Sequence, residues 1–271
     1  MPRTIVVTGA SSGVGLAAAT QFAAHGDHVV VVGRNRQRLD AAVDEVRRAG
    51  GGREPARYRA DFESLDEVRG LAGALRDAYG KIDVLANNAG GIIRGDHRRT
   101  KDGFEATLQG NHLAPFLLTN LLRDRLAGGR VVNTASDAHR NSNLDPDDLV
   151  SSPESYRAWR SYGASKAANI LFAAEAARRW PEIFSVSFHP GVVRTNFGGP
   201  GLIRAFYRFA PFLVSPRRAG GLLVWLATAP ESGLVNGGYY VGQQPKRPTG
   251  PAADPELAAR LWDASAKAVG L

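Results

Sequence analysis

Four polar residues in the middle of the chain have types suited to proton transfer. Tyr162 and Lys166 lie four residues apart, so on a helix both side chains project from one face. A tyrosine with a pKa near 10 is about 0.1% ionised at pH 7, and acid/base work requires that pKa to fall by ~2 to 3 pH units, which a neighbouring ammonium favours. The alternative for this pair is an ordinary helix-surface contact.

The residues around this pair favour a catalytic role over an ordinary surface contact. Ser136 stands just past an expected strand, and Asn111 lies in the expected helix before that strand. We expect Lys166 to stabilise the tyrosinate, Ser136 to hold a substrate oxygen, and Asn111 to order the water and backbone around Lys166. The predicted catalytic residues are therefore Asn111, Ser136, Tyr162 and Lys166.

The elements that position these residues follow an alternating pattern. Short β-branched runs alternate with longer alanine-rich stretches, which is typical of a parallel sheet buried on both faces. Strands are expected at 4–8, 28–32, 56–60, 84–87, 130–134, 185–189 and 238–241, and helices at 13–24, 36–49, 65–79, 102–125, 161–180, 216–229 and 255–268. The sequence predicts one α/β domain over residues 1–271, a Rossmann-type doubly wound parallel sheet of about seven strands flanked by helices.

A glycine-rich turn follows the first expected strand. Its glycines permit a tight turn and close approach of the backbone to a pyrophosphate, and the helix that starts there offers free amide groups. A purely structural turn is the alternative, but the place of the turn in the first βα unit favours a dinucleotide. The residues predicted to bind it are Gly9, Ser11, Ser12, Gly13, Val14 and Gly15.

The end of the second strand predicts the type of dinucleotide. An NAD site needs an acid there to bond the ribose 2′-hydroxyl, whereas this chain has Gly33, Arg34 and Asn35. Arg34 can bind a 2′-phosphate with charge-assisted hydrogen bonds, with Arg38 one turn further on. We therefore predict NADP(H) as the cofactor. The alternative, arginines that merely decorate a helix start, fits Arg36 better than Arg34.

Together these motifs resemble the short-chain dehydrogenase/reductase family, and within it the retinol-dehydrogenase-like group. Further motifs that carry the resemblance are Asn87-Asn88-Ala89-Gly90 and His189-Pro190-Gly191. The resemblance implies that Asp61 bonds the adenine amine beside Phe62, and that Lys166 also bonds the nicotinamide ribose. It also implies cofactor contacts from Asn88, Ala89, Gly90, Pro190, Gly191, Val193 and Thr195.

The expected reaction is hydride transfer between the nicotinamide and a carbonyl or alcohol, with Tyr162 as acid/base and no metal. His139 is predicted to contact substrate, although a surface or loop-packing role is an equal alternative. Irregular segments at 137–160 and 196–215 are expected to wall the pocket. The second is rich in aromatic residues, which predicts a small hydrophobic carbonyl or alcohol substrate. A non-catalytic NADP(H)-binding sensor or scaffold on the same fold is the alternative function, and the intact set of four polar residues argues against it.

The overall composition limits the kinds of binding partner that we expect. The net charge of +8 comes from arginines scattered along the chain, so we do not expect nucleic-acid binding. The absence of cysteine excludes disulfides and thiolate metal sites, and no apolar stretch is long enough to span a bilayer. We expect a cytoplasmic protein. Weak peripheral membrane contact through 196–215 stays open, as does a homodimer through the helices that carry Asn111 and Tyr162.

Overall fold

One sheet contains all the strands found in the computed structural model, which describes residues 2–93, 95–150, 153–154, 156–193 and 213–271. The strand order is β3-β2-β1-β4-β5-β6-β7-β8. The strands are β1 (Thr4–Thr8), β2 (His28–Gly33), β3 (Ala56–Arg59), β4 (Val84–Asn87), β5 (Arg130–Thr134), β6 (Phe184–His189), β7 (Tyr239–Val241) and β8 (Gln244–Lys246). Strands β1 to β7 pair in parallel, and β8 pairs antiparallel with β7.

The predicted single-domain, doubly wound α/β fold is confirmed, and the expected number of strands was one too low. The additional strand, β8, consists of the three exposed residues Gln-Pro-Lys. It has no apolar alternation, which is the signal from which strands are predicted. Strand β8 therefore exists because β7 offers it a free edge for pairing.

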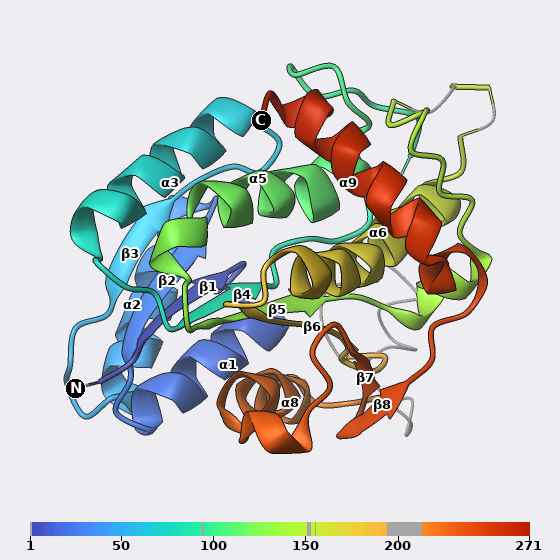
Figure 1. Cartoon of the computed structure of the whole chain (residues 1–271). Helices are drawn as coiled ribbons and strands as arrows, with labels where there is room; N and C mark the ends of the chain where they lie inside the picture. Colours follow the sequence, from blue (N-terminus) through green and yellow to red (C-terminus); the bar gives the residue numbers. More distant parts are fainter. Residues whose placement is uncertain (1, 94, 151–152, 155, 194–212) are drawn as a thin grey trace.

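Two apolar layers cover the two faces of the sheet. Along β1, Val6 belongs to one buried cluster, whereas Ile5 and Val7 belong to the other, because successive strand residues point to opposite faces. The first layer contains α3 (Leu65–Ala78), α5 (Ala114–Leu121), α6 (Ala158–Arg179) and α9 (Pro255–Val269), and the second contains α1 (Gly13–Ala24), α2 (Arg36–Ala49) and α8 (Pro216–Thr228) (Figure 1). Burial on both faces explains the continuous β-branched runs of the central strands.

Most element boundaries agree with the predicted ones to within one residue, with two exceptions. Helix α6 begins at Ala158, three residues earlier than expected. The helix expected at 102–125 is divided into α4 (Ala106–Leu108), a π-helix (Gln109–Leu113), α5 and a 3-10 helix (Arg123–Arg125). It starts late because Gly103 has a φ of +92° and because the Glu105 side chain caps α4.

Helix α9 lies across α5 and α6 (Figure 1). Its Trp262 ring packs against Phe116, Phe172 and Trp180 with centroid separations of 5.0, 5.7 and 4.8 Å. Aromatic pairs at these distances stabilise a core beyond their buried area. The C-terminal helix thus braces α5 and α6, the helices through which a homodimer was left open.

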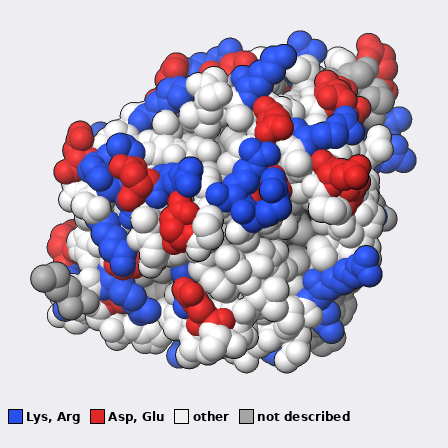
Figure 2. Space-filling model, viewed as in Figure 1, with Lys and Arg blue, Asp and Glu red and all other residues white. Residues whose placement is uncertain are grey.

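Charged side chains of both signs are interspersed on the face shown in Figure 2. Many arginines take part in surface ion pairs, such as Arg57 with Asp40 at 2.5 Å and Arg123 with Glu182 at 2.8 Å. This arrangement agrees with the interpretation of the positive net charge as a set of solvated helix surfaces. Within the described residues, no helix has the length and apolar character needed to cross a membrane.

Candidate active site

Most of the predicted functional residues follow the carboxyl ends of neighbouring strands. Strands β1, β4, β5 and β6 are parallel and adjacent, so their ends meet at one edge of the sheet. Strand β1 leads into α1 on one face, whereas β4 leads toward α5 on the other. Open α/β sheets bind ligands at such a switch point.

The glycine-rich turn joins β1 to α1. Gly9 and Gly13 have φ angles of +65° and +59°, which favour glycine. Ser12 precedes α1, and its side chain makes no capping hydrogen bond to the first turn, which contains Val14. Ser11 packs against Gly33 at the end of β2. The turn therefore offers backbone amide groups at a helix N-terminus, an arrangement that fits the pyrophosphate of a dinucleotide.

The turn after β4, which contains Asn88 and Ala89, packs against the glycine-rich turn. The Thr8 hydroxyl accepts hydrogen bonds from the N–H groups of Asn88 and Ala89, both at 3.0 Å, and Asn88 Nδ2 donates to the Thr8 carbonyl at 3.0 Å. A Cβ atom on Gly9 would lie 2.8 Å from the Cα of Ala89, and one on Gly15 would lie 2.5 Å from Asn88 Nδ2. These two glycines are therefore needed for the two turns to pack together.

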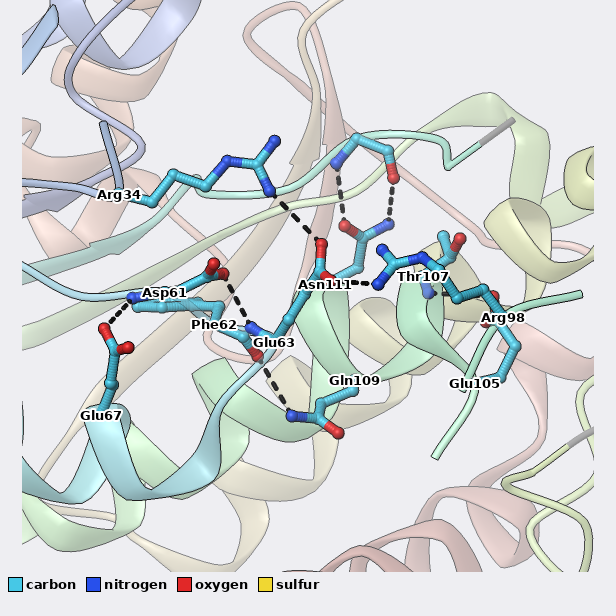
Figure 3. A network of polar contacts seen from close by, with 11 residues as sticks. Arg34, Asp61, Phe62, Glu63, Glu67, Arg98, Glu105, Thr107, Gln109 and Asn111 are labelled. Carbon is cyan, nitrogen blue, oxygen red and sulfur yellow. Dashed lines mark hydrogen bonds and ion pairs between the residues drawn. The ribbon is translucent and has the colours of Figure 1, made fainter. Parts of the chain in front are cut away.

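Arg34 follows β2 directly. Its side chain is 69% exposed, and its NH1 atom lies 3.3 Å from Oε1 of Glu63 (Figure 3). Arg38 is exposed one turn into α2. The Asn35 side chain accepts a hydrogen bond from the Arg38 N–H at 2.9 Å and so caps α2. Asn35 therefore has a structural role that the expectation of a cofactor contact overlooked.

The two residues expected near adenine follow β3. Asp61 Oδ1 accepts a hydrogen bond from the Glu63 N–H at 3.1 Å, and the Asp61 N–H donates to Glu67 Oε2 at 2.9 Å (Figure 3). Phe62 is buried in the apolar core, and its carbonyl accepts a hydrogen bond from Gln109 at 3.4 Å. Core packing alone accounts for the burial of Phe62.

Helix α6 brings Tyr162 and Lys166 together. Lys166 Nζ lies 5.5 Å from the centroid of the Tyr162 ring and donates a hydrogen bond to the Thr134 carbonyl at 3.0 Å. Both side chains are buried, and burial lowers the pKa of Lys166 to about 8 because the ammonium is removed from water. A cation is thus held against the tyrosine ring at the end of β5.

Asn111 connects this helix to the turn after β4. Its amide pairs with the backbone of Gly91 through two hydrogen bonds of 2.9 Å, and Nδ2 also donates to Ser165 Oγ at 2.9 Å. A Cβ atom on Gly90 would lie 2.5 Å from Asn111 Oδ1 and 3.6 Å from Lys166 Nζ. Asn111 lies in the π-helix, a form that occurs frequently at functional sites. The backbone beside Lys166 is therefore arranged by Asn111.

Ser136 begins a 3-10 helix (Asp137–Asn141) after β5, and its Oγ accepts a hydrogen bond from the Ala138 N–H at 3.2 Å. A Cβ atom on Gly163 would lie 2.7 Å from the carbonyl oxygen of Ala138. Because Gly163 has no side chain, the 3-10 helix packs on α6 immediately beside Tyr162. The expected irregular segment 137–160 thus starts as a helix that places Ser136 near α6.

His139 is only 1% exposed. Its Nδ1 lies 2.8 Å from the Ser136 carbonyl, its Nε2 accepts a hydrogen bond from the Thr249 N–H at 3.4 Å, and its ring packs edge-on against Tyr239. Burial lowers the pKa of His139. Both ring nitrogens have protein partners, so the geometry agrees with the loop-packing alternative rather than with the predicted substrate contact.

The segment after β6 is described as far as Val193. Gly191 has a φ of +84°, and a Cβ atom on it would lie 2.5 Å from a methyl group of Val214. Val193 forms an isolated bridge with Val214, which lies near the end of the expected pocket wall at 196–215. Pro190 stands between this turn and β6. Thr195 and the part of 196–215 before residue 213 lie outside the described residues.

Four residues near the site have no counterpart in the sequence prediction: Thr134, Trp159, Glu63 and Arg98. Thr134 acts through its carbonyl, which no residue type signals. Trp159 is 52% exposed, and the centroid of its ring lies 5.6 Å from that of Tyr162, a contact that the three-residue helical spacing could have indicated. Glu63 and Arg98 meet at 2.6 Å across a long sequence separation, which a single sequence does not reveal.

Comparisons with known proteins point to one family. The model of the short chain dehydrogenase family matches residues 3–200. The chain is 52% identical to DnrU of Streptomyces sp. (strain C5), named as a proposed daunorubicin C-13 ketoreductase, over 99% of this chain and 93% of DnrU. It is 35% identical to human retinol dehydrogenase 13, over 99% of this chain and 85% of that protein.

A solved structure adds a related fold with a cofactor. A short chain dehydrogenase from Burkholderia cenocepacia J2315 in complex with NADP superposes with a TM-score of 0.71 at 27% identity, covering 88% of this chain and 94% of that one. The family model and the curated relatives each span most of the chain. The chain belongs to the short-chain dehydrogenase/reductase family, in its retinol-dehydrogenase-like group.

Proposed function

We propose that this protein is an NADP(H)-dependent oxidoreductase that interconverts a carbonyl and an alcohol on a hydrophobic substrate, with Tyr162 as the acid/base. The observation that carries the proposal is the buried ammonium of Lys166, 5.5 Å from the Tyr162 ring and tied to the Thr134 carbonyl. A cation in this position lowers the cost of the tyrosinate, the form that accepts a proton from an alcohol. The names of DnrU and retinol dehydrogenase 13, a ketoreductase and an alcohol dehydrogenase, support the carbonyl–alcohol chemistry.

Each side chain of the site has a role in this proposal. A nicotinamide held at this site would supply the hydride chemistry of carbonyl reduction and alcohol oxidation. Tyr162 donates a proton to the carbonyl oxygen in reduction and takes it back in oxidation. Ser136 holds that oxygen by a hydrogen bond, and Lys166 keeps a positive charge beside the phenol. Asn111 acts indirectly, by fixing the backbone of Gly91 and the Ser165 hydroxyl through hydrogen bonds.

The cofactor proposal rests on Arg34. The glycine-rich turn of Gly9, Gly13 and Gly15 would hold the pyrophosphate, and the exposed Arg34 guanidinium would bind the 2′-phosphate. The NADP in the Burkholderia cenocepacia structure supports a nicotinamide dinucleotide for this fold. Asp61, which follows β3, would bond the adenine amine.

The substrate proposal rests on two exposed apolar side chains, one of which contacts Tyr162. Trp159 and Val192 are two of the large hydrophobic residues exposed in the described part of the chain, at 52% and 45%. Trp159 contacts the Tyr162 ring, and Val192 lies in the turn after β6. Burying such surface against a substrate yields about 25 cal/mol per Å². We therefore propose aldehydes, ketones or secondary alcohols with apolar groups as the substrate class.

The experiment combines cofactor binding with turnover. Purified protein is titrated with NADPH and NADH, and hydrophobic carbonyl compounds are then screened for NADPH oxidation. Tyr162→Phe should lower turnover by at least about 10³-fold and leave NADPH binding within twofold, because only the proton donor is removed. Tyr79→Phe is the matched control, since it removes a phenol at the end of α3. Full activity in Tyr162→Phe would refute the mechanism, and NADPH binding without turnover of any carbonyl would favour the sensor alternative.

A further inference from the structure

The carboxylate of Glu63 lies between two guanidinium groups. Its Oε1 is 3.3 Å from Arg34 NH1, and its Oε2 is 2.6 Å from Arg98 NH1. Figure 3 shows Arg34 and Arg98 approaching it from opposite sides. The Glu63 N–H donates to Asp61 Oδ1, so Glu63 is held beside the residue proposed to bond adenine. Glu63 thus contacts both Arg34 and Asp61, the two residues proposed to bind the adenosine part of the cofactor.

A phosphate on the ribose would face this acid. The Arg34 guanidinium proposed for the 2′-phosphate already carries a carboxylate as its anionic partner. Binding of the phosphate therefore requires Arg34 to leave Glu63, or two anions to share one cation at close range. The shorter contact belongs to Arg98, so Glu63 keeps a partner when Arg34 turns to the phosphate.

From this geometry we propose that Glu63 is a specificity-determining residue that competes with the 2′-phosphate for Arg34, and that Arg98 positions Glu63 and weakens this competition. The proposal rests on the proposed NADP(H) function. Competition by Glu63 gives the site a moderate rather than maximal affinity for the phosphorylated cofactor. A moderate affinity favours release of the cofactor after each turnover. A carboxylate that only links β3 to the loop before α4 would have no effect on the choice of cofactor.

The test uses two nucleotides that differ only by the phosphate. Adenosine 2′,5′-bisphosphate and AMP are titrated against the full chain by calorimetry at low ionic strength. Glu63→Gln should bind the bisphosphate about three- to tenfold more tightly and AMP unchanged, because it removes a negative charge and keeps the shape. Asp66→Asn is the matched control. It removes the same negative charge from the exposed ion pair of Asp66 with Lys101 at the start of α3, and it should change the affinity for neither nucleotide.

A double-mutant cycle tests the role of Arg98. Arg98→Met alone should weaken bisphosphate binding about threefold. Without Arg98, Glu63 would pair more strongly with Arg34 and would compete better with the phosphate. In the Glu63→Gln background, Arg98→Met should have no further effect. An equal loss in both backgrounds would show that Arg98 contacts the phosphate itself, and would overturn the positioning role.

The outcomes separate this inference from the proposed function. If the wild-type protein does not prefer the bisphosphate to AMP, the proposed cofactor is wrong and the inference fails with it. If the wild-type protein shows that preference and Glu63→Gln binds both nucleotides as the wild type does, Glu63 does not compete with the phosphate. In that case the inference is overturned and the proposed NADP(H) function stands.

Discussion

Replacing Lys166 by methionine should stabilise the folded protein while abolishing its activity. Burial lowers the pKa of Lys166 from 10.5 to about 8, which corresponds to about 3 kcal/mol of unfavourable free energy for the charged form. The hydrogen bond to the Thr134 carbonyl offsets about 1 kcal/mol of this cost. Lys166→Met has nearly the same length without the charge, so we expect it to be more stable than the wild type by about 2 kcal/mol at pH 7.

The lowered pKa of Lys166 also determines how the free energy of unfolding changes with pH. Below pH 8 the lysine is protonated in both the folded and the unfolded chain, so the folded state carries the full penalty. Between pH 8 and 10.5 the unfolded chain binds a proton that the folded chain lacks, so the free energy of unfolding rises with pH by at most about 1.4 kcal/mol per unit. The advantage of Lys166→Met should therefore shrink by about 1 kcal/mol between pH 7 and pH 9.

The assay is urea unfolding of both proteins at pH 7, 8 and 9, with carbonyl reduction measured on the same samples. Comparing the two proteins cancels the other titrating groups. Lys267→Met, which changes an exposed lysine on α9, is the control and should follow the wild-type stability at every pH. A variant that is less stable than the wild type at pH 7, or a stability difference that does not change with pH, would refute the reasoning.

Three further substitutions test how the site is held. Gly163→Ala should lower the free energy of unfolding by about 1 to 3 kcal/mol and reduce turnover more than NADPH binding, since its Cβ would lie 2.7 Å from the Ala138 carbonyl; unchanged kinetics would contradict the close packing. Trp262→Ala should cost about 3 to 5 kcal/mol in urea unfolding, because its ring packs on three aromatic neighbours, and a loss under 1 kcal/mol would argue against that cluster. Glu105→Ala should cost about 1 to 3 kcal/mol, since its buried carboxylate accepts from two backbone N–H groups of α4 and from the Ser161 hydroxyl; Ser161→Ala, which breaks one of these bonds, should cost less.

Much of the fold was predictable because its signals are local. The β-branched runs and the alanine-rich stretches between them predicted β1 to β7 nearly to the residue. Helical spacing alone placed Tyr162 and Lys166 on one face of α6, and the structure has them there. The tight turn after β1 was predictable from its glycines, two of which have positive φ angles.

Other features depend on contacts between distant parts of the chain. The π-helix that carries Asn111 separates α4 from α5, and hydrophobic periodicity does not encode such an interruption. The capping role of Asn35 and the burial of His139 against Tyr239 likewise depend on partners that a sequence pattern leaves open.

The amino-acid order by itself determined the alternation of strands and helices, the glycine-rich turn after β1, and the pairing of a tyrosine with a lysine on one helix. Each of these arises within one element or one βα unit. Only the tertiary structure decided what surrounds those groups. It placed the Thr134 carbonyl under Lys166, packed the 3-10 helix on Gly163, and set the Glu63 carboxylate between Arg34 and Arg98. These contacts join segments far apart in the chain, so their free energies appear only when the layers pack together.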